Sequence, residues 1–341
     1  PGYETCRYVF FPGCQAGAIA PDVVMQAYED LSNRVDRGVA LMLGCCGAIS
    51  EWAGRYEMTE KVNEQLKQEL AKLGDPIIIA GCPSCMKQLK ESIGAHVIGI
   101  WEILREIGLP QQAKGLEIPV AIHDACGARG DAQTQDMIRQ LLSDMGCIVE
   151  DTEYSRDLSP CCGYGGLTAY ANKDMAAKMT EKCLERSDAP YITYCMACRD
   201  RFAREGRESR HILELLYGAN ASNMPDISEK RYNRLILKQT LLKNIWNEEL
   251  MMEKKDYTVA YTEDAISMMD ERMILKSDVE RVLSDYRENQ EAIFDEETKE
   301  LVTRSRLGNV TFWVRFVETE EGYLVRRAYS HRMNIMKRVG Q

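Results

Sequence analysis

Short apolar runs alternate, over roughly the first two thirds of the chain, with segments in which apolar residues recur every three or four positions. The runs "YVFF" at 8–11 and "IIIA" at 77–80 are typical of short strands in a buried parallel sheet. The three-to-four spacing is typical of amphipathic helices, each ended by a glycine. Before Gly74 the apolar positions are Met58, Val62, Leu66, Leu70 and Leu73. Before Gly146 they are Met137, Ile138, Leu141, Leu142 and Met145. Strands that alternate with helices predict an α/β fold with a mainly parallel sheet.

Cysteine positions indicate that this pattern occurs twice. Ten of the 13 cysteines form two sets, and each set reads as a single Cys, then Cys-Cys-Gly, then Cys-x-x-Cys. Cys126 follows Cys14 by 112 residues, and Cys195 follows Cys82 by 113. Such near-constant offsets predict an internal duplication. The first set is Cys14, Cys45, Cys46, Cys82 and Cys85. The second set is Cys126, Cys161, Cys162, Cys195 and Cys198.

The pattern changes after about residue 218. A charged segment at 229–255 predicts an amphipathic helix with Leu235, Leu242 and Trp246 on its apolar side. "SDVE" at 277–280 predicts a capping box that opens a further helix. "NVTFWVRFVET" and "GYLVRRAYSHRM" then predict an antiparallel hairpin across a Glu-Gly turn. We therefore expect a first α/β domain at 1–112, a second at 113–218, a helical linker at 219–255 and a small α+β docking domain at 256–341.

Composition narrows the possible functions. A chain of 341 residues that is 45% hydrophobic and 28% charged can bury more than one core. Its net charge of −10 argues against a general nucleic-acid binder, because contacts to phosphates need a basic face. No apolar run approaches the roughly 18 residues that span a bilayer, and no secretory segment opens the chain. We therefore expect a cytoplasmic protein without a nucleic-acid partner or a membrane span.

The spacing of the cysteines bears on what their sulfur atoms hold. Thiols in a long chain without a secretory segment more often bind metal or carry out redox chemistry than form disulfides. A structural zinc ion takes four tetrahedral ligands, whereas each set offers five, two of them adjacent in sequence. An iron–sulfur cluster presents several irons, so adjacent thiolates can bind different ones. The spacing thus favours a cluster, with zinc in one half and unligated thiols as the alternatives.

These motifs resemble a known family. "PGC…GCCG…GCPSC" and "DACG…PCCGYGG…YCMAC" resemble the pair of CCG (cysteine-rich) domains in the cysteine-rich subunit of heterodisulfide reductase. Similar pairs occur in iron–sulfur subunits of glycolate oxidase, thiol:fumarate reductase and anaerobic glycerol-3-phosphate dehydrogenase. The resemblance covers about residues 6–218. It implies two Rossmann-like halves related by pseudo-twofold symmetry, each binding a noncubane [4Fe-4S] cluster through its five cysteines.

The resemblance also implies an activity. We expect an oxidoreductase subunit that reduces a disulfide or related thiol substrate between the two clusters. "GYGG" at 163–166 lacks the full dinucleotide-binding fingerprint, so we expect electrons from a flavin or ferredoxin-type iron–sulfur subunit. The alternatives are an electron-transfer subunit without its own substrate and a zinc-stabilised scaffold protein. The candidate catalytic residues are His123, as a proton or hydrogen-bond donor, and Lys87 and Arg199, as attractants for an anionic substrate; each has an ordinary structural role as its alternative.

The last segment, from about 256 to 333, resembles small helix–helix–sheet domains of the toxin-like or DUF4258 kind. It contains no cysteine, so we do not expect it to hold a cluster. Tyr329, Ser330 and His331 suggest a nuclease-like site, but the acidic net charge favours a docking surface.

Overall fold

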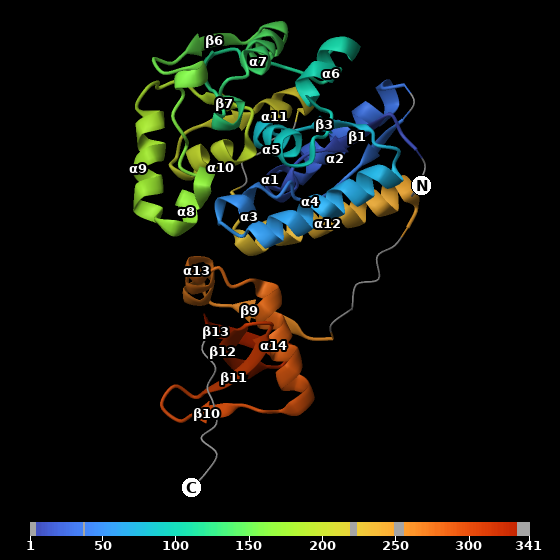
Figure 1. The fold of residues 1–341 in the computed structure, drawn as a ribbon. Helices are drawn as coiled ribbons and strands as arrows, with labels where there is room; N and C mark the ends of the chain where they lie inside the picture. Colours follow the sequence, from blue (N-terminus) through green and yellow to red (C-terminus); the bar gives the residue numbers. More distant parts are fainter. Residues whose placement is uncertain (1–4, 37, 219–223, 249–255, 333–341) are drawn as a thin grey trace. The chain divides into compact units, whose positions relative to one another are not determined.

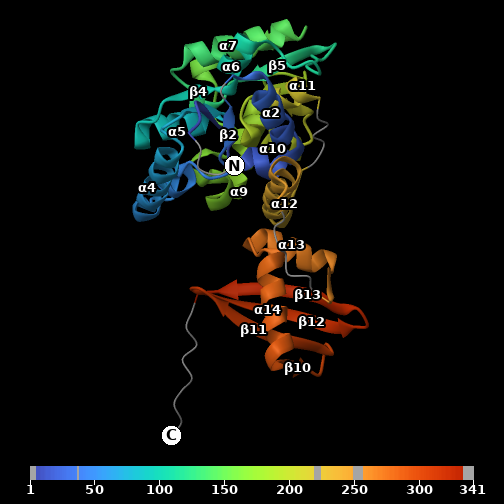
Figure 2. The same ribbon diagram turned by 90° about the vertical axis from the view of Figure 1, so that its right-hand side faces the viewer.

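A computed structural model describes residues 5–36, 38–218, 224–248 and 256–332. The chain divides into two compact units. Unit 1 comprises residues up to Met224 together with Asn233–Glu248, and unit 2 comprises Pro225–Tyr232 together with the residues from Glu249 onward. Figures 1 and 2 show the ribbon from two directions. Within the described residues, no helix combines the length and the apolar character that crossing a membrane requires.

The first half of unit 1 contains a four-stranded parallel sheet. Its strands are β1 (Tyr8–Phe11), β2 (Val39–Leu41), β3 (Ile77–Ala80) and β4 (Val97–Gly99), in the order β2-β1-β3-β4. The helices between and after them are α1 (Cys14–Ile19), α2 (Pro21–Arg34), α3 (Ala48–Trp52), α4 (Tyr56–Lys72), α5 (Pro83–Ile93) and α6 (Ile100–Ile107). All four residues of β1 are buried, as expected for a strand covered on both faces.

The second half repeats this arrangement. Its parallel strands are β5 (Pro119–His123), β6 (Ile148–Asp151), β7 (Tyr191–Thr193) and β8 (Ser209–His211), in the order β6-β5-β7-β8. Its longer helices are α7 (Ala132–Asp144), α9 (Lys173–Leu184), α10 (Met196–Arg204) and α11 (Ile212–Tyr217). The short ones are η1 (Cys126–Ala128), η2 (Arg156–Leu158), η3 (Gly165–Leu167) and α8 (Thr168–Ala171). The strand order thus confirms the duplicated α/β organisation expected from the cysteine offsets.

The glycine-ended helices are also confirmed. Helix α4 ends at Lys72, and Gly74 follows with a φ of 80°. Helix α7 ends at Asp144, and Gly146 follows with a φ of 82°. A positive φ is costly for residues with a Cβ, which explains glycine at both ends. The expected apolar side of α4 is correct at Leu66 and Leu70, but Met58 is 52% exposed at the first turn.

Helix α12 (Ile227–Trp246) differs from its expected packing. Its most buried side chains are Leu237 and Leu241, whereas Leu235 is exposed. Leu237 lies against Gly17 of α1, where a Cβ would be 3.0 Å from the leucine side chain. The part of α12 from Asn233 onward belongs to unit 1, so it is a packed helix there and not a free linker. Sequence spacing alone could not identify the face that meets α1, because apolar residues occur on more than one side of the helix.

The described part of unit 2 from residue 256 onward is a five-stranded sheet with two helices. Its elements are β9 (Thr258–Tyr261), α13 (Glu263–Arg272), α14 (Lys276–Asn289), β10 (Ile293–Asp295), β11 (Glu300–Leu307), β12 (Val310–Thr319) and β13 (Gly322–His331), with strand order β10-β11-β12-β13-β9. Strands β12 and β13 form the expected antiparallel hairpin. Helix α14 crosses one face of the sheet, where Val314 and Phe316 are fully buried (Figure 2).

The predicted capping box was misplaced. Helix α14 begins at Lys276, and its N-cap is Leu275, whose backbone N–H donates to the Asp278 carboxylate at 3.0 Å. Ser277 and Glu280 therefore lie inside the helix. Asp278 takes the reciprocal acidic role of a capping box three residues after the N-cap, and the serine does not set the helix start.

Candidate functional site

The cysteines of both sets follow the carboxyl ends of parallel strands. Cys14 begins α1 just after β1, and Cys82 is the N-cap residue of α5 just after β3. Cys126 begins η1 after β5, and Cys195 is the N-cap residue of α10 after β7. Ligand sites of open α/β sheets lie at this edge, and the α5 and α10 N-termini favour anionic sulfur there.

The ten thiols form one continuous row. In each half, hydrogen bonds between side chains link the single cysteine to the Cys-Cys pair and that pair to the Cys-x-x-Cys pair. Cys82 is hydrogen-bonded to Cys195, and this contact joins the two halves. The full order is Cys14, Cys45, Cys46, Cys85, Cys82, Cys195, Cys198, Cys162, Cys161 and Cys126. The sequence predicted two sets, and the structure brings both together.

The sulfur atoms of the ten cysteines follow one another in a row and do not surround a single point. Among the described residues, no group of three or more His, Cys, Asp or Glu side chains is arranged to hold a single metal ion. The pKa of two buried thiols is raised: that of Cys162 chiefly by its hydrogen bond to Cys161, and that of Cys198 chiefly by its hydrogen bond to Cys162, with burial adding to both.

The glycine of each Cys-Cys-Gly motif has a positive φ, and its N–H group contacts a cysteine sulfur atom. Gly47 and Gly163 have φ values of 89° and 91°, in the region that favours glycine. Their backbone N–H groups hydrogen-bond to the sulfur atoms of Cys45 and Cys161, respectively. The pKa of Cys45 and of Cys161 is lowered to about 2. The largest cause is the hydrogen bond to the single cysteine of the same set, the next is the bond to the second cysteine of the pair, and the glycine N–H contributes less. The first cysteine of each pair is therefore the one most readily ionised.

We predict that Gly163→Ala destabilises the protein strongly. A left-handed backbone costs a residue with a Cβ about 1–2 kcal/mol, and the added Cβ would also lie 2.6 Å from the Ala176 carbonyl oxygen. Gly206 provides a matched control, since its φ is 77° and nothing lies within 4 Å of an added Cβ. Urea unfolding should show a larger loss for Gly163→Ala than for Gly206→Ala. Equal losses would mean that the contact with Ala176 relaxes without cost.

A cavity of about 60 Å³ lies where the two halves meet. All five cysteines of the first set line it, together with Cys195 of the second. The rest of the wall is mostly apolar: Pro12, Ala16, Ala48, Ile49, Trp52, Met196 and Ala197, with the polar side chains Gln15, Ser84 and Tyr164. Burial raises the pKa of Tyr164, and the neighbouring Tyr170 side chain raises it further, so this phenol stays protonated.

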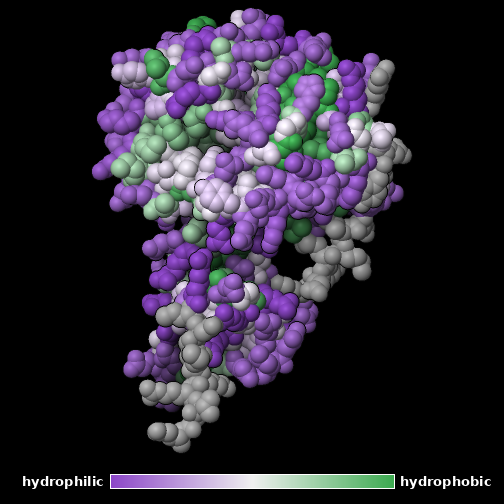
Figure 3. All heavy atoms as spheres, in the orientation of Figure 1, coloured by the Kyte–Doolittle hydropathy of each residue, from purple (hydrophilic) through white to green (hydrophobic). Residues whose placement is uncertain are grey.

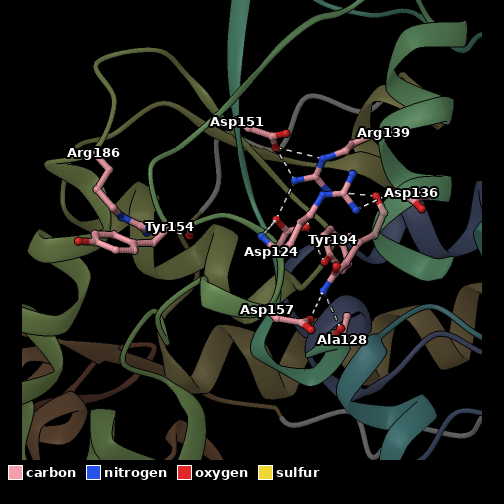
Figure 4. Close-up of polar contacts among 11 residues, drawn as sticks. Asp124, Ala128, Asp136, Arg139, Asp151, Tyr154, Asp157, Arg186 and Tyr194 are labelled. Carbon is pink, nitrogen blue, oxygen red and sulfur yellow. Dashed lines mark hydrogen bonds and ion pairs between the residues drawn. The ribbon is translucent and has the colours of Figure 1, made fainter. Parts of the chain in front are cut away.

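A polar network holds the second cysteine set (Figure 4). The Asp124 carboxylate, two residues before Cys126, is fully buried and accepts two hydrogen bonds from the Arg139 guanidinium, at 2.8 and 3.0 Å. It also accepts the backbone N–H of Arg156 at 2.6 Å and the hydroxyl of Tyr194 at 2.9 Å. Burial opposes ionisation, but the bonds and charge of Arg139 lower the pKa of Asp124. The network ties the turns before Cys126, Cys161 and Cys195 to one carboxylate.

The three candidate catalytic residues have different surroundings. The His123 ring is buried against Phe202, with 4.8 Å between ring centroids, and neither ring nitrogen has a partner; burial lowers its pKa to about 4. Lys87 has a side chain that is 60% exposed and lies 4.0 Å from Glu91. Arg199 is buried and ion-paired with Glu214 at 3.3 Å. None of the three lines the cavity, and their catalytic roles stay predictions.

Sequence reasoning missed one basic residue beside the first set. Arg234 of α12 donates a hydrogen bond to the Cys14 carbonyl oxygen at 3.3 Å, and its charge contributes to the low pKa of Cys45 after the larger effects of the Cys14 and Cys46 thiols. The contact joins positions 220 residues apart, so no local motif could reveal it. The interpretation of Cys147 and Cys183 as small buried residues is confirmed.

Comparison with known proteins places these features in a family. Residues 8–90 and 120–202 match the family model of the cysteine-rich domain named CCG. The chain contains two CCG domains. Each domain contains one full cysteine set and the first three strands of one parallel sheet.

Two curated proteins resemble the chain. An uncharacterized iron–sulfur protein of Methanococcus maripaludis is 26% identical over 206 residues, which cover 57% of this chain and 40% of that protein. An uncharacterized iron–sulfur protein of Methanocaldococcus jannaschii is 26% identical over 180 residues, which cover 51% of this chain and 35% of that protein. The chain thus spans well under half the length of these relatives.

Among solved structures, an aspartate racemase homologue from Pyrococcus horikoshii covers 68% of this chain and 99% of its own, with 11% identity and a TM-score of 0.24. A score at that level supports no conclusion about the fold.

Proposed function

We propose that this protein is the iron–sulfur subunit of an oxidoreductase that reduces a disulfide or related thiol substrate, in the manner of the cysteine-rich subunit of heterodisulfide reductase. The observation that carries the proposal is the continuous row of ten thiols, five from each CCG domain. The relatives named above are iron–sulfur proteins, which supports redox chemistry in this family. We further propose that the two Rossmann-like halves are related by pseudo-twofold symmetry.

The residues present fit two clusters of the noncubane [4Fe-4S] type. Each CCG domain supplies five sulfur donors, and Gly47 and Gly163 direct backbone N–H groups at the more acidic thiol of each adjacent pair. The His123 ring offers two buried nitrogens without partners near Cys161 and Cys195. We assign the first cluster to Cys14, Cys45, Cys46, Cys82 and Cys85, and the second to Cys126, Cys161, Cys162, Cys195 and Cys198. When bound, such clusters supply electrons one at a time.

The protein's own residues would bring the two cysteine sets together and shape the site beside them. The contact between Cys82 and Cys195 brings the two sets within hydrogen-bond distance, which suits delivery of two electrons to one substrate bond. Ile49, Trp52 and Met196 give the cavity an apolar wall beside the sulfur atoms. Electrons would come from a flavin or ferredoxin-type partner subunit in the cytoplasm.

Reoxidation kinetics test this proposal. The anaerobically reduced protein should be reoxidised by small disulfides with release of two thiols per disulfide. If disulfides leave the reduced protein unchanged while a redox protein reoxidises it, the electron-transfer alternative holds and the proposed activity is wrong. Metal analysis separates both from the zinc-scaffold alternative.

The domain boundaries at residues 112, 218 and 255 lead to a further prediction. Residues 256–341 contain no cysteine, and the part from Glu249 onward belongs to unit 2. We propose that this segment, with its DUF4258-like arrangement, serves docking. Its deletion should leave iron and sulfide content unchanged and weaken association with the electron-donating partner. Loss of iron from the truncated protein would show that the segment supports the CCG domains.

A further inference from the structure

The two CCG domains differ at one buried position beside their cysteines. Phe11 lies three residues before Cys14, and His123 lies three residues before Cys126. We propose that His123 donates a ring N–H hydrogen bond to the second cluster, and that the second cluster is therefore reduced more readily than the first, where Phe11 has no N–H to donate. This inference rests on the proposed function, because it concerns the two clusters assigned there. It narrows the expectation that His123 donates a proton or a hydrogen bond.

Strand register shows that the two positions are equivalent. Phe11 ends β1, and its partner on β3 lies two residues before Cys82. His123 ends β5, and its partner on β7 lies two residues before Cys195. Both side chains are buried, at 0% and 1% exposure. They are therefore separate from the surface, where hydrophobic side chains of unit 1 lie among many hydrophilic ones on the face in Figure 3.

The His123 ring has hydrogen-bonding capacity that the described residues do not use. Neither ring nitrogen has a hydrogen-bond partner among them. Phe202 packs edge-on against the ring, with 4.8 Å between the centroids, and the ring lies close enough to Cys161 and Cys195 to interact electrostatically with both. A histidine ring carries at least one N–H in either protonation state, and a buried donor without an acceptor is unfavourable. A cluster held by these cysteines would supply that acceptor.

The first CCG domain has a hydrocarbon ring at the equivalent place. The Phe11 ring comes within 3.8 Å of the point where a Cβ would stand on Gly44, the residue before Cys45. Hydrogen bonds to the sulfur atoms and the polarity of the surroundings are two means by which a protein sets the potential of a cluster. A donor stabilises the reduced form more than the oxidised form, because hydrogen bonds to a more negative acceptor are stronger. The domain with His123 should therefore hold the first electron.

Other features that affect cluster potentials are matched between the domains. In both sets, the second member of the adjacent pair and the second member of the Cys-x-x-Cys pair are buried, and the other three cysteines are partly exposed. Gly47 and Gly163 donate backbone N–H groups to equivalent sulfur atoms. One arginine lies near each site, Arg234 beside the first set and Arg186 beside His123. Solvent exposure and these charges thus give little reason for a difference.

His211 is a second buried histidine near Cys195. Its Nδ1 atom accepts the backbone N–H of Leu213 at 3.2 Å, and its ring is also hydrogen-bonded to the backbone of Tyr194. The hydrogen bonds of this ring thus go to the protein backbone. We therefore assign the donor role to His123.

An anaerobic redox titration of the cluster-loaded full chain, followed by electron paramagnetic resonance, tests the inference. In the wild type, the reduction equilibrium constant of the second cluster should exceed that of the first about tenfold, which separates the two one-electron potentials by about 59 mV. His123→Phe copies the first domain, so it should lower the higher potential and bring the two together. His123→Gln keeps an N–H donor and should retain most of the separation. Phe11→Leu is the matched control, since it removes a buried ring but no donor, and it should leave the separation unchanged.

A second measurement uses the chain without a substitution at His123. In protein labelled with ¹⁵N-histidine, a ring nitrogen that is hydrogen-bonded to the reduced cluster should give a weak ¹⁵N coupling in pulsed electron paramagnetic resonance. The coupling should persist in His211→Gln, because the proposed donor is still present there. Its loss in that variant would assign the hydrogen bond to His211 and overturn the inference.

The remaining outcomes separate this inference from the proposed function. Two clusters of equal potential in the wild type, an unchanged separation in His123→Phe, or no histidine ¹⁵N coupling would overturn the inference and leave the two-cluster assignment in place. A chain that holds no iron after anaerobic reconstitution would overturn the proposed function and this inference with it.

Discussion

Replacing Cys46 by alanine is expected to remove roughly half of the bound iron and sulfide. Cys46 is 4% exposed and hydrogen-bonded to Cys45 and Cys85, so its sulfur lies inside the first set. If adjacent thiolates bind different irons of one cluster, neither can replace the other. Cys162→Ala should give the mirror result in the second set, because Cys162 occupies the equivalent place between Cys161 and Cys198. Anaerobic iron and sulfide assays measure both.

Cys147→Ala is the matched control for these variants. Cys147 is buried like Cys46 but belongs to neither set, so its removal should leave iron content unchanged. Full retention of iron in both Cys46→Ala and Cys162→Ala would refute the ten-cysteine assignment. Loss of all iron in either variant would instead show that the Cys82–Cys195 contact couples the two sets.

Replacing Asp124 by asparagine is expected to destabilise the second CCG domain by about 3–5 kcal/mol. The change removes the buried one of the two carboxylates that pair with Arg139 and weakens the bonds from Arg156 and Tyr194. Because these bonds hold the turns that carry the second cysteine set, iron loss should be confined to about half of the total. Chemical unfolding and iron analysis of the same preparation would measure both effects.

Asp151→Asn is the matched control for Asp124→Asn. Asp151 pairs with the same arginine, but its side chain is 47% exposed, and exposed ion pairs contribute about 0–1 kcal/mol. A similar loss of stability in the two variants would mean that Arg139, and not the buried carboxylate, organises the turns. Loss of iron from the first set in Asp124→Asn would contradict the local role assigned to the network.

The parts predicted from sequence depend on local patterns. The sequence predicted the strand before each Cys-x-x-Cys pair and the helix after it, because each depends on few neighbouring residues. It also predicted the duplication, because the whole pattern occurs twice. The hairpin of β12 and β13 followed from alternation and a short turn. The predicted start of helix α14 was wrong, because the acidic residue that completes its capping box is Asp278 and not Glu280.

The parts that sequence could not predict depend on contacts between distant residues. Arg234 reaches the Cys14 carbonyl across 220 positions, and Tyr194 reaches Asp124 across 70. The attraction of anions by Arg199 was inferred from its place after Cys198, but its side chain is buried against Glu214. Spacing gives the order of charged groups along a helix, whereas only the packed structure shows which of them face solvent, a partner or the cavity.

The measurement that tests the central claim most directly is the iron and acid-labile sulfide content per chain of anaerobically purified protein. Two [4Fe-4S] clusters predict about eight irons and a similar amount of sulfide per chain. One or two zinc ions per chain without sulfide, or a protein free of metal after anaerobic reconstitution with iron and sulfide, would contradict the account.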